Sequence, residues 1–216
     1  MKKPLKIYIA DDHTLFRKAM VGLISSFENV SEVKDAENGK ELLALIKSQQ
    51  PDVAIIDLQM PVMDGTAASE QILKKYPDVK IIILTMHDSD KFILHMMELG
   101  VHGFLLKNTE PEELEKAIVA VTEKDFYHND LVANVLRKTV QQRKGQRPFF
   151  GPPGLSEREK EILVLLCEGL NNKEIGERLS LSEHTIRNHK ANIMEKLGVE
   201  NIVGLVRYAF EAGLMK

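Results

Sequence analysis

The sequence of 216 residues predicts an α/β domain with a five-stranded, doubly wound parallel sheet, followed by a small all-α domain. Short β-branched runs alternate with helical patterns up to about residue 126, and only amphipathic helical patterns occur from Leu155 onward. The net charge of −3 divides in the same way, into −6 over residues 1–126, +4 over 127–154 and −1 over 155–216. An acidic first part, a basic middle and a nearly neutral end indicate two domains joined by a linker.

The composition narrows the class of protein. Apolar residues make up 44% and charged residues 28% of the chain, a balance typical of a protein that buries a core. No apolar run approaches the length of about 20 residues that crosses a bilayer, and Asp11 and Asp12 interrupt the first apolar stretch too early for a secretory signal. The single cysteine, Cys167, forms neither an internal disulfide nor a Cys-rich zinc site. We therefore expect a cytoplasmic protein.

Four apolar runs and one weaker candidate predict the five strands of the first domain. The clear runs lie at residues 5–10, 53–57, 80–85 and 103–106, and the weaker one lies at residues 32–36. Segments with helical spacing separate them, and the first carries an apolar stripe at Leu15, Ala19, Leu23 and Phe27. Because each connection exceeds about a dozen residues, the strands must be parallel with helices on both faces. No GxGxxG motif follows the first strand, so a dinucleotide-binding version of this architecture has no support.

Polar residues follow the predicted strands at the edge where such sheets bind ligands. Asp11 and Asp12 follow the first strand, Asp57 and Thr85 end two others, and Lys107 follows the last. Three carboxylates repel each other unless a cation intervenes, and oxygen-only ligands suit Mg²⁺. A carboxylate beside Mg²⁺ can attack phosphorus, while a hydroxyl and an ammonium can hold the phosphoryl oxygens. Each residue alone would be a strand-end cap or a solvated charge, but the five together indicate a phosphoacceptor site.

These residues carry a resemblance to a known family. Asp11-Asp12, Asp57 within DLQMPVMDG, Thr85 within IIILTM and Lys107 within GFLLK are similar to the receiver domain of two-component response regulators, over roughly residues 4–125. The resemblance implies a flavodoxin-like receiver fold. It also implies that Asp57 accepts a phosphoryl group from a sensor histidine kinase.

The same resemblance implies roles for individual residues. Asp12, Asp57 and the backbone carbonyl of Gln59 would ligate Mg²⁺ directly, with Asp11 acting through water, and Thr85 and Lys107 would bind the phosphoryl group. Phe104, three residues before Lys107, matches the family's switch aromatic, whose ring turns inward when the threonine moves toward the phosphate. Without the resemblance, Phe104 would be interpreted as an ordinary core aromatic.

A basic linker is predicted between the two domains. We expect the linker, with one helix, at residues 127–153, so that the domains span residues 1–126 and 154–216. Asn129 or Asp130 can cap the helix. The stretch QRPFFGPPG after it contains three prolines and two glycines and is predicted to be a hinge. We interpret the basic residues as a solvated helix face, with contact to DNA phosphates as the less favoured alternative.

Four short helices are predicted in the second domain. A capping box at Ser156 and Glu159 begins the first, and NNKEIGERL forms the second. Ser182 caps a third helix that ends at Leu197, and a last helix covers about residues 201–212. A helix, a tight turn and a helix inside a four-helix core is a helix-turn-helix arrangement.

One face of the third helix carries side chains suited to reading DNA. Arg can bond guanine bidentately, Asn can do the same to adenine, and Ala can contact a thymine methyl. These types lie away from the predicted core positions Ile186, Ile193 and Leu197. The predicted DNA contacts are His184, Arg187, Asn188 and Ala191 and, toward the phosphates, Lys173, Lys190 and Lys196. The alternative is a solvated face of mixed polarity, which the net charge of −1 favours.

The second domain also carries a resemblance. LSEREKEIL followed by NNKEIGERLSLSEHTIRNHKANIMEKLGV is similar to the LuxR-type (NarL/FixJ) DNA-binding domain, over about residues 153–214. It implies that the Ser182–Leu197 helix reads DNA and that the last helix contributes to a dimer. Ala191 replaces a basic residue that some relatives carry, and Ile202 stands where many carry Arg. We therefore expect a weakly binding monomer and a dimer on two half-sites.

Together these features predict a response regulator of the NarL/FixJ class. We expect a sensor histidine kinase and promoter DNA as partners, Mg²⁺ as cofactor, a homodimer in the phosphorylated state and no membrane partner. One alternative is an aspartyl-phosphate phosphohydrolase, which is disfavoured because Gln59 stands two residues after Asp57, where an acid or base for turnover would be needed. Another is a helix-turn-helix that binds a protein, which the Arg187, Asn188 and Ala191 face disfavours.

Overall fold

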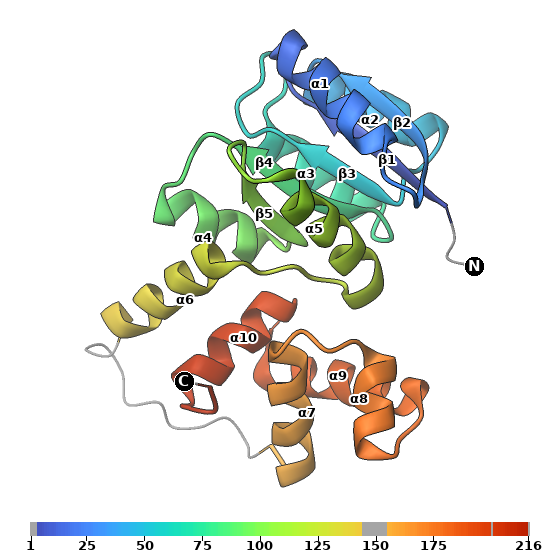
Figure 1. Ribbon diagram of the computed structural model, residues 1–216. Helices are drawn as coiled ribbons and strands as arrows, with labels where there is room; N and C mark the ends of the chain where they lie inside the picture. The colour runs from blue at the N-terminus through green and yellow to red at the C-terminus, as the bar shows by residue number, and fades with distance from the viewer. Residues whose placement is uncertain (1–3, 144–154, 200, 216) are drawn as a thin grey trace. The chain divides into compact units, whose positions relative to one another are not determined.

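The computed structural model describes residues 4–143, 155–199 and 201–215 (Figure 1). The chain divides into two compact units, Met1–Tyr127 and His128–Lys216. The predicted hinge QRPFFGPPG lies outside the described residues. The proposed domain boundaries therefore stay predictions.

The first unit is built on one parallel sheet. Its strands are β1 (Leu5–Ala10), β2 (Val30–Ala36), β3 (Val53–Ile56), β4 (Lys80–Thr85) and β5 (Gly103–Leu106). They are arranged in the order β2-β1-β3-β4-β5, and every neighbouring pair is parallel. The predicted five-stranded, doubly wound parallel sheet is confirmed.

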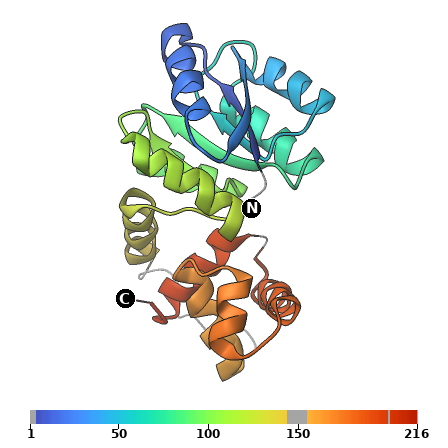
Figure 2. The same ribbon diagram turned by 45° about the vertical axis from the view of Figure 1, so that its right-hand side comes forward.

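Four helices connect the strands, and a fifth follows the last strand. They are α1 (Thr14–Ser25), α2 (Gly39–Ser48), α3 (Gly65–Lys75), α4 (Asp90–Leu99) and α5 (Pro111–Lys124). Apolar side chains of α1 and α5 pack with those of β1, β3, β4 and β5 in one core cluster. The helices α2 and α3 cover the opposite face of the sheet (Figure 2). Right-handed crossovers between parallel strands place helices on both faces in this way.

The apolar stripe predicted on the first helix is partly wrong. Leu15 is 87% exposed and Ala19 is also exposed, whereas the buried positions of α1 are Arg17, Met20 and Ile24. A four-residue repeat drifts away from the 3.6-residue turn of a helix, so it does not follow the buried face over several turns. The pattern was also misleading because an arginine occupies one of the core positions.

The second unit is all helical within the described residues. Its helices are α6 (Asp130–Arg143), α7 (Glu157–Cys167), α8 (Asn172–Leu179), α9 (Glu183–Leu197) and α10 (Ile202–Glu211). The turn between α8 and α9 includes Ser180 in the left-handed conformation, with φ 56°. Of the three core positions predicted on α9, Ile186 and Ile193 are fully buried and Leu197 is half-buried. The helix α10 packs against α6, α7 and α9 and closes the core of the unit.

Among the residues that the structure describes, no helix combines the length and apolar character that a membrane span requires.

Candidate functional site

An acidic cluster lies at the carboxyl end of the parallel sheet. Ligand atoms of Asp11, Asp12, His13 and Asp57 all lie within 4.8 Å of one another. The register of β1 on β3 pairs Ala10 with the residue before Asp57, and the Asp57 amide donates to the Ala10 carbonyl at 2.9 Å. Asp11 and Asp57 are only 2% and 4% exposed, while Asp12 is exposed. The sheet therefore holds two buried carboxylates side by side, with a third at the surface.

Lys107 forms ion pairs with both buried carboxylates. Its Nζ lies 2.7 Å from Asp11 Oδ2 and 2.6 Å from Asp57 Oδ2, and 4.8 Å from the centre of the Phe16 ring. Burial alone would lower the pKa of the Lys107 ammonium, but the hydrogen bonds to Asp11 and Asp57 outweigh that effect and raise the pKa above its ordinary value. The ammonium therefore stays charged and balances part of the negative charge of the cluster.

His13 is a member of the cluster that the sequence patterns did not indicate. Its Nδ1 lies 2.9 Å from Asp12 Oδ1 and 3.4 Å from Asp11 Oδ1, and its main-chain amide donates to Asp11 Oδ1 at 2.8 Å. The signal in the sequence is its position directly after the two aspartates that follow β1. His13 was not predicted because only carboxylates, hydroxyls and amines at strand ends were interpreted as site residues.

Thr85 is the last residue of β4, and Phe104 lies within the neighbouring strand β5. Thr85 is fully buried, its hydroxyl accepts from the His87 amide at 3.3 Å, and its carbonyl accepts from the Lys107 amide at 2.9 Å. Phe104 is paired with Ile83 across β4 and β5, and its side chain is fully buried. The structure thus has the aromatic ring in the inward position, and the predicted turning of the ring stays a prediction.

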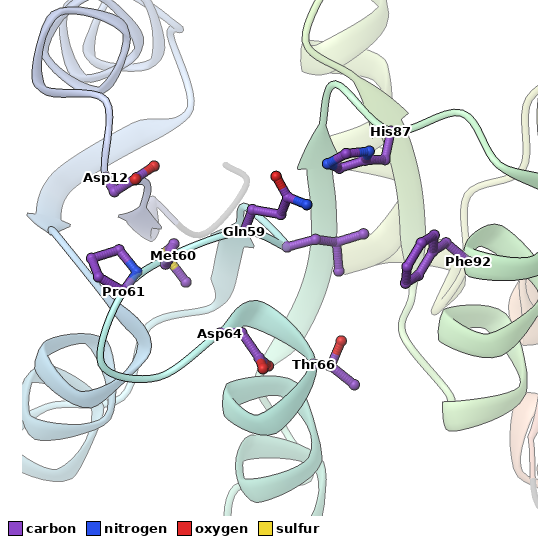
Figure 3. A pocket seen from close by; sticks show the side chains of 9 residues that line it. Asp12, Gln59, Met60, Pro61, Asp64, Thr66, His87 and Phe92 are labelled. Atoms are coloured by element: carbon purple, nitrogen blue, oxygen red, sulfur yellow. The ribbon is translucent and has the colours of Figure 1, made fainter.

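A cavity of about 520 Å³ opens beside the acidic cluster (Figure 3). It is lined by Asp12, Leu58, Gln59, Met60, Pro61, Asp64, Thr66, His87 and Phe92. Gln59, the predicted carbonyl ligand, is exposed on this loop between β3 and α3. The cavity gives a ligand a route from solvent to the exposed carboxylate of the cluster.

The loop between β3 and α3 is fixed against the cluster by a glycine. The Gly65 amide donates to the Leu58 carbonyl at 2.9 Å. A Cβ atom at Gly65 would lie 2.1 Å from the carbonyl oxygen of Asp57, which is closer than atoms can approach. Only glycine therefore allows the start of α3 to lie against the end of β3.

The donor set suits a hard divalent cation. It offers carboxylate oxygens from Asp11, Asp12 and Asp57, and Gln59 adds a main-chain carbonyl on the adjoining loop. Mg²⁺ prefers oxygen ligands and usually retains several waters. The open side of the cavity leaves room for these waters. The residues present therefore fit the metal that the sequence predicted.

The predicted DNA-reading face lies on α9. Its N-cap, Ser182, accepts from the Thr185 amide at 3.0 Å. The side chains of His184, Arg187, Asn188 and Ala191 are exposed, as is Lys173 on α8, while Lys190 is half-buried.

Two of these side chains have partners along the helix. Arg187 Nη2 lies 3.2 Å from Glu183 Oε1, and Asn188 Nδ2 lies 3.4 Å from His184 Nε2. Both contacts are exposed to solvent, so Arg187 and Asn188 can exchange these partners for water at little cost in free energy.

Lys196 differs from the other predicted DNA contacts. Its Nζ lies 2.6 Å from Oε1 of Glu159, a residue of α7 that is only 6% exposed. The hydrogen bond from Lys196, together with that from the Ser156 amide, lowers the pKa of Glu159 to about 2. The pair joins α7 to α9, a role that helical patterns do not reveal. Contact between Lys196 and DNA stays a prediction.

Comparisons with known proteins agree with this geometry. Residues 7–119 match the family described as response regulator receiver domain, and residues 153–209 match the family described as bacterial regulatory proteins, luxR family. The chain is 38% identical to the oxygen regulatory protein NreC of Staphylococcus carnosus, over 98% of this chain and 99% of that one.

Solved structures are similar over nearly the whole chain. One is RcsB of Salmonella enterica serovar Typhimurium, bound to a promoter in the presence of the phosphomimetic BeF₃⁻, with 29% identity, a TM-score of 0.59 and coverage of 97% and 100%. Another contains two RcsB dimers bound to two parallel DNAs, with 29% identity, a TM-score of 0.58 and coverage of 97% and 99%.

Proposed function

Because this chain belongs to the NarL/FixJ family of response regulators, we propose that Asp57 is its phosphoacceptor and that phosphorylation there controls promoter binding through α9. The chain is a DNA-binding transcription regulator of a two-component system, and its phosphodonor partner is a sensor histidine kinase. The observation that carries the assignment of Asp57 is its buried carboxylate beside Asp11 and 2.6 Å from the Lys107 ammonium.

The proposed reaction is an attack by a carboxylate oxygen of Asp57 on the phosphorus of a phosphohistidine. The bond from phosphorus to the imidazole nitrogen breaks, and an aspartyl phosphate forms. Mg²⁺, held by Asp12, Asp57 and the Gln59 carbonyl with Asp11 acting through water, would shield the negative charges that meet in this step. Lys107, which pairs with Asp57 in the structure, then binds a phosphoryl oxygen.

The proposed switch uses Thr85 and Phe104. The buried Thr85 hydroxyl moves toward the phosphoryl group and binds it. Phe104, on the neighbouring strand, couples the movement of Thr85 to the surface of the unit. A phosphoryl group shifts the receiver only by the difference in its affinity for the two conformers. Full burial of Phe104 supports a state in which the ring is already inward, so we expect phosphorylation to stabilise this state.

The proposed DNA interface is the exposed face of α9. Arg187, Asn188 and Ala191 offer base contacts, His184 completes the face, and Lys173, Lys190 and Lys196 offer phosphate contacts. The related RcsB, bound to a promoter with BeF₃⁻ and bound to DNA as dimers, supports a phosphorylated homodimer on two half-sites.

We infer that the receiver catalyses only its own phosphorylation and dephosphorylation. The residue two positions after Asp57 is Gln59, which cannot act as the acid or base that a phosphohydrolase needs for turnover. The proposed target, promoter DNA, would place the protein in the cytoplasm.

Phosphorylation of the intact chain tests the proposed acceptor. The full chain is incubated with phosphoramidate and Mg²⁺, and its intact mass is measured. We expect the parent to gain one phosphoryl group, Asp57→Asn to gain none, and removal of Mg²⁺ with a chelator to stop the reaction. Asp64→Asn is the matched control, because Asp64 lines the same cavity and asparagine can replace it as the N-cap of α3. A phosphoryl group on Asp57→Asn, or none on the parent, would contradict the proposal.

A second measurement tests the DNA interface. The full chain with beryllofluoride and Mg²⁺ is used to select duplexes from a random pool, and the enriched sequences are read. We expect a symmetric pair of half-sites, and we expect Asp57→Asn to enrich none under the same conditions. Enriched duplexes that share no sequence would show only non-specific binding to the phosphates and would contradict the proposed base contacts.

A further inference from the structure

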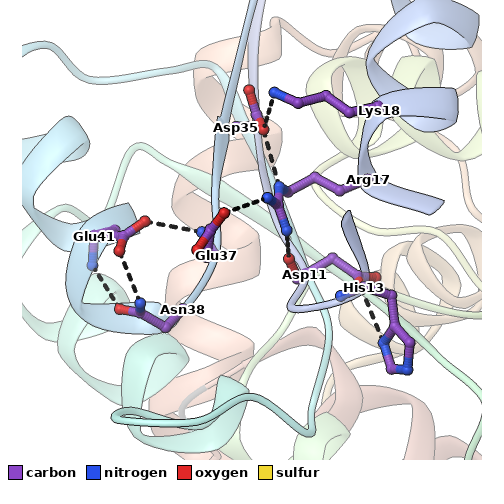
Figure 4. A network of polar contacts seen from close by, with 8 residues as sticks. All are labelled: Asp11, His13, Arg17, Lys18, Asp35, Glu37, Asn38 and Glu41. Carbon is purple, nitrogen blue, oxygen red and sulfur yellow. Dashed lines mark hydrogen bonds and ion pairs between the residues drawn. The ribbon is translucent and has the colours of Figure 1, made fainter. Parts of the chain in front are cut away.

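Arg17 of α1 is a fully buried arginine that joins three segments of the receiver (Figure 4). Its Nε donates to Asp35 Oδ2 at 2.9 Å, and its Nη2 donates to Glu37 Oε1 at 2.7 Å. Its Nη1 donates to the main-chain carbonyl of Asp11 at 2.5 Å. One guanidinium therefore connects α1 with the residue that follows β1, with the end of β2 and with the residue that follows β2.

The three acceptors of Arg17 differ in their access to water. The side chains of Asp35 and Glu37 are 24% and 64% exposed, and Asp35 has a second partner in Lys18 Nζ at 2.8 Å. Both carboxylates could exchange the guanidinium for water at a modest cost. Asp11 is only 2% exposed, so its carbonyl would lose its partner in a buried environment. The contact with Asp11 is thus the one that depends most on Arg17.

Asp11 is held at each of its polar atoms. Its amide donates to the Ala36 carbonyl at 3.2 Å, and its two carboxylate oxygens receive the His13 amide at 2.8 Å and the Lys107 ammonium at 2.7 Å. Arg17 supplies the partner of the carbonyl, which belongs to the peptide joining Asp11 to Asp12. Movement of this peptide would move two of the three carboxylates of the acidic cluster.

We propose that Arg17 is a positioning residue of the phosphoacceptor site. It holds the Asp11–Asp12 peptide so that both carboxylates face the divalent cation, and it acts through Asp11. This inference rests on the proposed function, because it assigns a role toward the same cation. Partners that orient metal ligands typically change metal affinity by about 10-fold to 100-fold when they are replaced.

Lysine is the informative replacement. It keeps the positive charge that Asp35 and Glu37 require, but a single ammonium cannot reach three acceptors in the fixed fork of a guanidinium. We expect Arg17→Lys to leave the Asp11 carbonyl without its bond. Arg17→Gln, which removes the charge, is the second variant.

The experiment measures the Mg²⁺ dissociation constant of the full chain by calorimetric titration, together with its thermal midpoint. We expect the dissociation constant to rise about 10-fold or more in Arg17→Lys. Glu37→Gln is expected to bind Mg²⁺ like the parent, because it leaves the Arg17–Asp11 bond in place. Met20→Ala is the matched structural control, since it removes a buried side chain from the same helix and lowers the thermal midpoint without touching Asp11.

The outcomes separate a positioning role from a structural one. Weaker Mg²⁺ binding in the Arg17 variants, with parent-like binding in Glu37→Gln and Met20→Ala, supports the proposal. Parent-like binding in either Arg17 variant, equal losses in Met20→Ala, or failure of both Arg17 variants to fold would overturn it. A parent chain that does not bind Mg²⁺ would contradict the proposed function itself, whatever the Arg17 variants do.

Discussion

Two buried carboxylates and one buried ammonium set the chemistry of the receiver at the scale of single residues. Asp11 and Asp57 share Lys107, whose Nζ is within 2.7 Å of an oxygen of each. Buried like charges are tolerated only with a compensating partner. The same lysine therefore stabilises the site, and in the proposed reaction it also binds the phosphoryl group.

Removal of that lysine should make stability depend on the cation. We expect Lys107→Met to lower the free energy of unfolding by about 3 kcal/mol in a chelator, because two buried carboxylates then lack their partner. Mg²⁺ should restore more of that free energy in the variant than it adds to the parent, since the cation replaces the lost positive charge. Urea unfolding with and without Mg²⁺ measures both values.

Lys80→Met is the control for this prediction. Lys80 also forms an ion pair, with Asp125, but that partner is half exposed, so its loss should cost less than about 1 kcal/mol. Equal effects of the two variants, or an effect of Lys107→Met that Mg²⁺ does not change, would contradict the assignment.

A second residue-scale prediction concerns Glu159. Its folded-state pKa of about 2 lies below the ordinary value of 4.5, mainly because of the hydrogen bond from Lys196. The charged pair therefore stabilises the fold above about pH 5, and this contribution is lost as the pH falls through about 2. We expect Glu159→Gln to be less stable than the parent near neutral pH by on the order of 1 kcal/mol, because the Lys196 partner is partly exposed.

The lone cysteine reports this loss for the second unit alone. Cys167 is buried and its pKa is raised to about 12 by burial, so the folded unit protects its thiol. Labelling with a pyridyl disulfide, which reacts in acid, measures unfolding between about pH 2 and 7. The difference in free energy of unfolding between the parent and Glu159→Gln should shrink toward pH 2. Glu157→Gln, which changes an exposed pair with Lys160, should have the same free energy of unfolding as the parent at each pH. A difference that is constant with pH would show that the pair does not titrate as described.

At the scale of elements, burial explains which strands the sequence predicted well. The strands β1, β3, β4 and β5 are mostly buried and apolar, and their patterns were clear. The edge strand β2 is mostly half-buried and carries polar residues, so its pattern was weak and its predicted range, residues 32–36, was shorter than Val30–Ala36.

The candidate site shows a similar limit. Strand-end positions indicated Asp57, Thr85 and Lys107 because parallel strands bring their carboxyl ends to one edge. The contacts of His13 and Arg17 could not be predicted in this way. Arg17 meets residues 18 and 20 positions away, and no periodic pattern encodes side-chain contacts over that distance.

The helix α9 carries the prediction for DNA recognition. We expect Arg187→Ala to cost about 1–3 kcal/mol on the preferred sequence and little on others, because a bidentate base contact is lost. Lys190→Ala should weaken binding to all sequences about equally and reduce the slope of affinity against salt by roughly 1. Fluorescence anisotropy over a series of salt concentrations measures both, and parent-like binding by both variants would exclude this face.

At the scale of the whole molecule, phosphorylation and DNA recognition belong to different units. The acidic cluster lies in Met1–Tyr127 and the predicted DNA-reading face in His128–Lys216. Phosphorylation can change DNA binding by α9 only if it changes the free energy of an assembly or of a contact between units. The absence of basic residues at Ala191 and Ile202 implies weak binding by one copy, so assembly is the simplest route.

The most direct test of this account is the molar mass of the full chain by light scattering, in Mg²⁺, with and without beryllofluoride, for the parent and Asp57→Ala. We expect the parent to be a monomer alone and a dimer with the phosphoryl mimic, and we expect Asp57→Ala to stay a monomer in both conditions. A parent whose mass does not respond to the mimic, or an Asp57→Ala variant that dimerises with it, would contradict control of assembly by Asp57.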